Sequence, residues 1–165
     1  MQPVRLADGA IILRDDYKSG LETIEAALDT LSQILAGKRI VVMGEINEPP
    51  RSAHLIYRNL GEHMAQIASC AIFIGSHSRF KEFSSGARRG GLEKDKLFYV
   101  RGSVMEVGHI LQHNIIAGDV VLIKGRSNQK PERVTFLLMG EEVSCDIGFC
   151  KAKINCEHCP MLKRR

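Results

Sequence analysis

Four cysteines near the end of the chain form a candidate metal site. They are Cys145, Cys150, Cys156 and Cys159, with the spacing Cys-x4-Cys-x5-Cys-x2-Cys. Four thiolates can close a tetrahedral Zn²⁺ site, and a Cys-x2-Cys pair is a common half of such a site. The irregular spacing leaves open an iron–sulfur cluster, His158 in place of one thiolate, unligated thiols, or disulfides in an exported protein. Among the metals, zinc suits this donor set best.

Charged side chains that follow apolar runs form a second candidate site. Lys124 and Arg126 flank a glycine directly after one run, and His77 follows another. Fixed cations suit a carboxylate or a phosphate. In an open parallel sheet, ligands bind outside the carboxyl ends of the strands. Solvated loops also follow every buried strand, which explains part of the pattern. We predict an anionic ligand at this edge, with Lys124 and Arg126 partly exposed.

Five apolar runs must position these groups. Each run is apolar at every residue and does not alternate between apolar and polar residues. This pattern is typical of strands that are buried on both faces of a sheet. The runs are Ile11–Leu13, Ile40–Met43, Ala71–Ile74, Leu97–Val100 and Val120–Ile123.

Amphipathic stretches between the runs predict helices. The first has one apolar face, made of Leu21, Ile24, Leu28, Leu31 and Leu35. A second extends from about Ser52 to Ala68, and a third follows Ser103. Ser19 with Glu22, and Ser103 with Glu106, have the spacing of capping boxes. Alternating strands and helices predict an α/β fold: a Rossmann-like, mostly parallel sheet with helices on both faces.

Two segments depart from this alternation. Residues 83–96 are polar and contain Arg88-Arg89-Gly90-Gly91, which predicts a mobile loop. After Gly140 the chain has four of its five cysteines and little periodicity. We therefore divide the chain into an α/β domain, residues 1–139, and a short cysteine-rich C-terminal extension, residues 140–165.

The composition limits the function classes. The chain has 165 residues, 44% hydrophobic and 25% charged, which suits one globular domain. It has no apolar stretch of membrane-spanning length and no secretory signal at its start, so we expect a cytoplasmic protein with reduced cysteines. The net charge of +4 includes Lys163, Arg164 and Arg165, but Trp is absent and aromatic residues make up only 5%. This argues against nucleic-acid binding, although a binding domain built on the basic end is the third alternative.

Nucleotide-binding fingerprints are absent from the sequence. No Gly-x-Gly-x-x-Gly follows a predicted strand, which argues against a dinucleotide site. Gly37-Lys38-Arg39 is similar to the end of a phosphate-binding loop, but it precedes a strand and lacks the leading glycine. The chain by itself therefore has no phosphate-binding loop.

Three motifs in order resemble the C-terminal domain of the Mur ligase family. The first is Asp15-Asp16-Tyr17-Lys18-Ser19-Gly20 ahead of Ala26-Ala27-Leu28; the second is Val42 to Glu48; the third is Gly118 to Gly125. Within the family, the pattern is most similar to the ligase that adds D-alanyl-D-alanine in peptidoglycan synthesis. The resemblance extends from about Gly9 to Val134 and implies the family's fold. It does not supply the cysteine-rich tail.

The resemblance also implies a reaction and a set of contacts. Family members use ATP and Mg²⁺ to phosphorylate a carboxylate, and an amine attacks the acyl phosphate to give an amide. A central domain carries the phosphate-binding loop, and the C-terminal domain closes over it. The implied residues are Asp15, Tyr17 and Lys18 at the nucleotide, and Glu48, His77, Lys124 and Arg126 at the amino-acid or peptide substrate.

Several positions depart from the family's motifs at this edge. Lys18 and Gly20 stand in place of two asparagines, Tyr57 in place of a frequent histidine, and Arg126-Ser127 in place of Ser-Arg. Helix capping is an alternative role for Asp15. We expect a ligase domain that is inactive without a central domain, in the same chain or a partner. The second hypothesis is a non-catalytic Mur-like binding module with a zinc-stabilised, partner-binding tail.

Overall fold

The computed structural model describes residues 1–49 and 52–162. The basic end, residues 163–165, lies outside the described residues. Six strands form one sheet in the order β1-β2-β6-β3-β4-β5. The strands are β1 (Gln2–Arg5), β2 (Ile11–Asp15), β3 (Arg39–Met43), β4 (Cys70–Ile74), β5 (Leu97–Val100) and β6 (Val120–Lys124). The helices are α1 (Leu21–Ser32), α2 (Ala53–Ala65), α3 (His77–Arg89), α4 (Val104–Gln112) and α5 (Glu132–Leu138).

The five strands expected from the apolar runs are confirmed, and they pair in parallel. β6 lies between β2 and β3, with Leu122 opposite both Leu13 and Val41. β1 was not predicted. It pairs antiparallel with β2 at the edge of the sheet. Its sequence, Gln-Pro-Val-Arg, carries no apolar run, and an edge strand can tolerate a proline because one side makes no ladder bonds.

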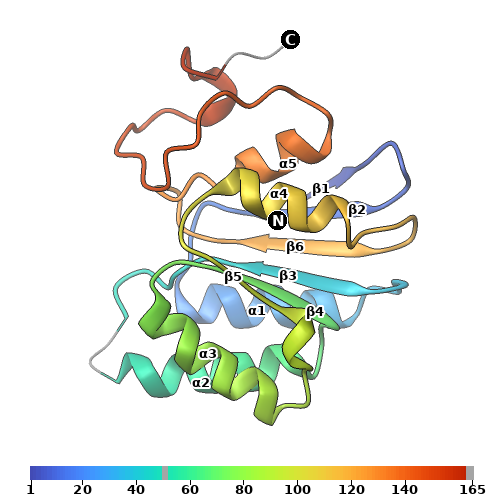
Figure 1. Cartoon of the computed structure of the whole chain (residues 1–165), viewed down its shortest axis with the longest axis vertical. Coiled ribbons are helices and arrows are strands. Elements are labelled where there is room, and N and C mark those ends of the chain that lie inside the picture. The colour runs from blue at the N-terminus through green and yellow to red at the C-terminus, as the bar shows by residue number, and fades with distance from the viewer. Residues whose placement is uncertain (50–51, 163–165) are drawn as a thin grey trace.

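Helices cover both faces of the sheet, as expected (Figure 1). α1, α2 and α3 lie on one face, and their core includes Leu28, Tyr57 and Phe83. α4 and α5 lie on the other, where Val107 and Val134 pack against the sheet. The carboxyl ends of the five parallel strands therefore meet at one edge. No helix among the described residues is long and apolar enough to cross a membrane.

The prediction of a mobile loop over residues 83–96 is wrong. α3 continues to Arg89, and a short 3₁₀ turn at Lys94–Lys96 leads into β5. Phe83 and Ala87 are fully buried one helical turn apart. Two glycines of this segment allow close packing, because a Cβ on Gly86 would collide with the backbone of α2 at Arg58, and one on Gly90 with the Glu62 carbonyl. These contacts are long-range, so the local sequence does not reveal them.

The N-cap bond of one of the two expected capping boxes is present. Ser103 accepts a hydrogen bond from the backbone N–H of Glu106 at 3.2 Å and caps α4. At α1 the N-cap residue is Gly20, without a side-chain bond, so the expected box at Ser19 and Glu22 is wrong. Ser19 is instead buried, and its carbonyl accepts from the N–H of Asn47. The loop before α1 is thus held by the loop after β3.

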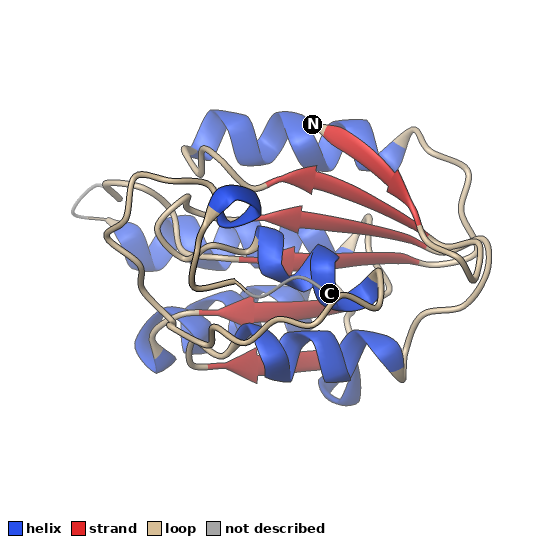
Figure 2. Cartoon of the chain, turned by 90° about the horizontal axis from the view of Figure 1, so that it is seen from above, coloured by secondary structure: helices blue, strands red, loops and turns tan. Residues whose placement is uncertain are grey.

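The cysteine-rich tail docks on the α/β core with almost no regular structure (Figure 2). Val143, Cys156 and Leu162 pack with Phe136 of α5 in a small apolar cluster. Arg133, also on α5, is fully buried. Its guanidinium donates to the tail carbonyls of Cys145 and Ile147, both at 2.6 Å. One buried side chain therefore ties the tail to the core.

Candidate functional site

Two of the candidate residues at the strand ends, Lys124 and Asp15, form an ion pair with each other. Lys124 ends β6, and its ammonium lies 3.0 Å from the Asp15 carboxylate at the end of β2. It also donates to the Lys18 carbonyl. The expectation that Lys124 is partly exposed is wrong, since its side chain is 0% exposed. Lys124 holds the loop that contains Asp15, Tyr17 and Lys18 in place, and its charge is already paired.

Replacement of Lys124 is therefore expected to destabilise the domain. Lys124→Ala leaves the Asp15 carboxylate and the Lys18 carbonyl without their donor and creates a cavity in the sheet. We expect a loss of about 2–3 kcal/mol in the free energy of unfolding, reduced because Asp15 is partly exposed. Urea unfolding followed by circular dichroism measures this loss. An unchanged midpoint would mean that the Lys124–Asp15 pair contributes nothing to stability.

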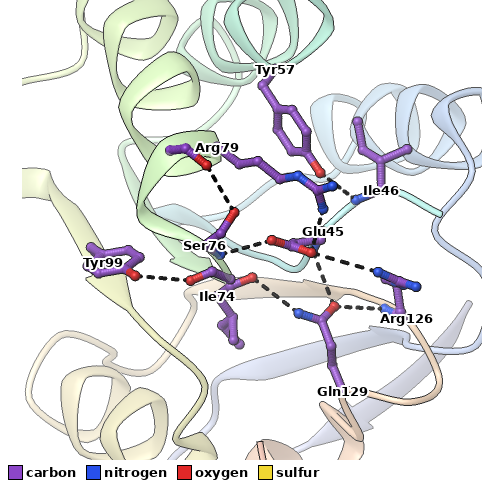
Figure 3. Close-up of polar contacts among 11 residues, drawn as sticks. Glu45, Ile46, Tyr57, Ile74, Ser76, Arg79, Tyr99, Arg126 and Gln129 are labelled. Carbon is purple, nitrogen blue, oxygen red and sulfur yellow. Dashed lines mark hydrogen bonds and ion pairs between the residues drawn. The ribbon is translucent and has the colours of Figure 1, made fainter. Parts of the chain in front are cut away.

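Glu45, one residue beyond the glycine that follows β3, is the centre of the polar network at this edge (Figure 3). Its carboxylate accepts from the Ser76 N–H at 2.9 Å and from the Arg79 guanidinium at 2.5 Å. The Arg126 guanidinium lies 3.7 Å away. Glu45 thus occupies the N-terminus of α3, where backbone N–H groups favour an anion. Two guanidiniums share this carboxylate, so the network carries a net positive charge.

Gln129 links the ends of β3, β4 and β6 to one another. Its amide donates to the Ile74 carbonyl at 3.2 Å, and its oxygen accepts from the N–H groups of Glu45 and Arg126. A Cβ at Gly44 would collide with this amide. The glycine after β3 is therefore needed for close packing of Gln129, and Gln129 fixes the backbone from which Glu45 and Arg126 project.

A hollow of about 370 Å³ opens beside this network, and we call it the edge hollow. Its lining combines both signs of charge with small residues: Glu45, Gly75, Ser76, Arg101, Gly102, Arg126, Gln129, Gly148 and Phe149. Arg101 follows β5, and Gly148 and Phe149 come from the tail. The edge hollow therefore presents two guanidiniums and one carboxylate at the carboxyl ends of the strands; of the predicted residues it includes Arg126 but not Lys124.

A second hollow of about 510 Å³ lies between the loop after β2 and the tail, and we call it the lysine hollow. Its lining holds three lysines and no carboxylate: Tyr17, Ser127, Asn128, Lys130, Phe149, Cys150, Lys151, Ala152, Lys153 and Asn155. Tyr17 is 71% exposed and Phe149 is 53% exposed, and they are the two exposed aromatic side chains of the described residues. An exposed aromatic ring beside clustered cations suits a ligand with both a ring and phosphates.

The remaining predicted substrate residues lie apart from both hollows. Glu48 is exposed on the loop after β3, in a left-handed backbone conformation with φ of 45°. His77 begins α3 and packs against Tyr99, with ring centroids 5.5 Å apart. It lines a different hollow, on the outer side of α3, together with Lys81 and Arg88. Neither residue lines the edge hollow.

Tyr57, which departs from the family motif, has a structural role here. It is fully buried, and its hydroxyl accepts from the Ile46 N–H at 2.8 Å. The Arg79 guanidinium lies 5.7 Å from the centre of its ring. Burial raises the pKa of the Tyr57 phenol, so it stays neutral and fixes the loop that carries Glu45.

All four tail cysteines line one small cavity of about 20 Å³. Its other lining residues are Lys130, Arg133, Ala152, Ile154 and Leu162, whereas His158 does not line it. All four thiols are free. Burial and the nearby Glu132 carboxylate raise the pKa of the Cys156 thiol to about 12. Within residues 1–49 and 52–162, no three His, Cys, Asp or Glu side chains are arranged as metal ligands.

The sequence analysis did not identify three residues of the polar network around Glu45: Glu45 itself, Arg79 and Gln129. Glu45 was visible as an acid after a predicted strand, but nothing local distinguishes it from Glu48. Arg79 lies in the first turn of α3, a helix that the sequence analysis did not predict. Gln129 is a polar residue in a loop. Gly44 and Gly75, each directly after an apolar run, were the available signal for close approach at this edge.

Comparison with known proteins gives consistent matches. The family model described as Mur ligase, glutamate ligase domain, matches residues 1–127. The MurF ligase of Thermotoga maritima, solved in complex with ADP, has a TM-score of 0.69 at 19% identity, over 84% of this chain and 30% of that one. MurF of Acinetobacter baumannii has a TM-score of 0.68 at 21% identity, over 84% and 30%.

A structure from Haemophilus ducreyi matches over nearly its whole length. It is a single domain ascribed to a UDP-N-acetylmuramate–peptide ligase, with a TM-score of 0.59 at 15% identity, over 84% of this chain and 96% of that one. The two MurF ligases are much longer, and this chain spans less than a third of each. The model match ends before α5 and the tail.

Proposed function

Because the chain belongs to the Mur ligase family through its glutamate ligase domain, we propose that it positions the incoming amino acid and contacts the nucleotide in an ATP-dependent, amide-forming ligase. The amino acid would bind in the edge hollow, and the nucleotide would lie across the loop after β2. The chemistry requires a central domain with a phosphate-binding loop, in the same chain or a partner. Reduced cysteines and a cytoplasmic setting are part of this proposal.

The observation that carries the proposal is the mixed charge of the edge hollow. An amino acid has a carboxylate and an amine, and the hollow offers Arg101 and Arg126 to the first and Glu45 to the second. A guanidinium can bind a carboxylate with two parallel hydrogen bonds. The Arg126 side chain is 26% exposed, so a ligand can reach it. Glu48 and His77 would contact only a longer, peptide-like substrate, because they lie outside this hollow.

The nucleotide contact is assigned to the loop that Lys124 and Asp15 hold. Tyr17 and Lys18 are exposed on this loop. Asp15 acts by positioning them, because its carboxylate is bound to Lys124. The lysines of the lysine hollow offer cations to phosphates, and Mg²⁺ would be held chiefly by the central domain and the nucleotide.

The domain's contribution to the reaction is positioning. ATP converts the acceptor's carboxylate to an acyl phosphate, which the amine attacks. Residues of the edge hollow hold the amino acid with its amine beside Glu45 and open to the acyl phosphate, and the proton that the amine releases passes to the leaving phosphate or to water. Closure over the central domain excludes water, which would hydrolyse the acyl phosphate. The 165-residue chain alone is expected to release no phosphate from ATP.

Binding experiments test the assignment of the edge hollow. The probe is D-alanyl-D-alanine, followed by NMR chemical-shift changes in the full chain. We expect shifts at Gly75, Gly102 and Gly148, and at least a tenfold loss of affinity in Arg126→Met, which corresponds to about 1.4 kcal/mol. Arg88→Met, an exposed arginine of α3, is the matched control. Equal affinity in both variants, or shifts confined to α3, would contradict the assignment.

One observation favours the second candidate, a non-catalytic binding module. The Lys124–Asp15 pair is closed, and the tail supplies part of the wall of both hollows. A partner could therefore bind the tail without nucleotide. Titration with ADP separates the candidates: shifts at Tyr17 and Phe149 support the ligase domain, and their absence supports the binding module.

A further inference from the structure

The order of the tail needs a cause beyond its apolar contacts. Between Gly140 and Leu162 the large apolar side chains are few, and four of them stay exposed: Ile147, Phe149, Ile154 and Met161. Ordering the backbone costs about 1–2 kcal/mol per residue. The buried side chains of Val143 and Leu162 stabilise by roughly 1.5–3 kcal/mol each, which is too little for more than twenty residues. Apolar contacts alone therefore do not account for the ordered tail, and the hydrogen bonds from Arg133 and Lys130 to tail carbonyls add to them.

Cys156 and Cys159 share one 3₁₀ turn, whereas Cys145 and Cys150 come from the loop before it, yet all four line the same small cavity. Cys70, the remaining cysteine, lies in β4, in the apolar core between the sheet and α4. The rest of the cavity wall combines the apolar side chains of Ala152, Ile154 and Leu162 with the cations of Lys130 and Arg133. A small cavity lined by four thiols suits a metal that prefers sulfur ligands.

Buried cations beside the thiols also favour a metal. Arg133 and Lys130 line the cavity and are 0% and 5% exposed. The Arg133 guanidinium lies 3.4 Å from the Cys145 sulfur. Zn²⁺ with four thiolates has a net charge of −2, which two cations offset. If the thiols were neutral, or paired as two disulfides, these cations would be left with carbonyl oxygens and the Glu132 carboxylate. That carboxylate accepts a hydrogen bond from the Cys156 N–H at 3.3 Å.

We propose that Cys145, Cys150, Cys156 and Cys159 bind one zinc ion that locks the tail onto the core. In the arrangement described, the thiols are not yet at ligand positions. Rotation of their side chains into the cavity brings them together, because all four are free and already on its wall. Phe149 lies in the chain between Cys145 and Cys150. If the proposed function holds, the metal therefore also fixes Phe149 in the walls of both hollows.

Metal analysis of the full chain tests the zinc site directly. After purification under reducing conditions, we expect about one zinc per chain, and Co²⁺ in its place should give the absorption of a tetrahedral thiolate complex. Cys156→Ser with Cys159→Ser should lose the metal, whereas Cys70→Ala, which changes the cysteine outside the tail, should keep it. Metal-free chain with a protease-resistant tail, iron in place of zinc, or two disulfides in mass spectra would each overturn the proposal.

Removal of the metal from the unmodified chain avoids any folding defect of the variants. A zinc chelator should make the chain sensitive to protease beyond about Gly140 while the circular dichroism of the α/β core is unchanged, and added zinc should restore resistance. If the tail stays resistant to protease after the zinc is removed, the metal does not hold the tail on the core. Bound zinc with no binding of D-alanyl-D-alanine or ADP would leave the metal site standing and reject the ligase assignment.

Discussion

Arg133→Met is expected to release the tail from the α/β core. The guanidinium donates to the tail carbonyls of Cys145 and Ile147, and to those of Lys130 and Gln129 in its own segment. Methionine fills similar volume but donates no hydrogen bond, so these buried carbonyls lose their partner. Hydrogen bonds to charged groups contribute about 1.5–3 kcal/mol each, so the two short bonds to the tail together account for about 3–6 kcal/mol of docking. This is about as large as the contribution of the small cluster around Phe136, so the variant loses a large share of the free energy that docks the tail.

The measurement is hydrogen exchange with limited proteolysis. In Arg133→Met, amides beyond about Gly140 should exchange fast and the tail should be cut, while β3, β4 and β6 stay protected. Arg88→Met is the matched control, because this arginine is exposed on α3. A variant with a protected tail would mean that other contacts, or the bound metal, hold it without Arg133. Zinc-loaded and zinc-free samples of the variant distinguish these two cases.

Gly86→Ala is expected to destabilise the whole domain. A Cβ at Gly86 would collide with the Arg58 carbonyl, and a Cβ at Gly61 with the Phe83 carbonyl, so α2 and α3 cross at backbone contact. The opposing atoms belong to helix backbone and cannot move aside singly. The helices must separate, which loosens Phe83 against Phe73. Overpacking of this kind costs about 2–4 kcal/mol.

Thermal unfolding measures the effect of Gly86→Ala. A loss of this size lowers the melting temperature by roughly 5–15 °C for a chain of this length. Ser85→Ala is the matched control, since Ser85 precedes Gly86 on the exposed side of α3 and the helix propensity also improves. A melting temperature for Gly86→Ala equal to that of Ser85→Ala would show that the helix crossing tolerates a methyl group.

The sequence by itself determined the five parallel strands of the sheet, though not β1 or the strand order. Runs such as Val120–Ile123 are apolar on every side, and only a strand covered on both faces can bury them. Helices with a regular apolar face, such as α1, follow from the same local rule. The motifs around Asp15, Glu48 and Lys124 indicated the family, which the match over residues 1–127 confirmed. These features are readable because each is encoded within a few consecutive residues.

Only the tertiary structure decided which charged residues can meet a ligand. Lys124 looked like an exposed cation, but its partner Asp15 lies 109 positions away in the chain and closes the pair. The second half of α3 looked like a loop because it is polar, and its glycine, Gly86, serves a contact with α2. The edge hollow draws on the ends of four strands and on the tail, and the lysine hollow joins Tyr17 to Phe149. Pairing, close approach and shared cavities depend on distances in space between distant residues, and a single sequence does not encode those distances locally.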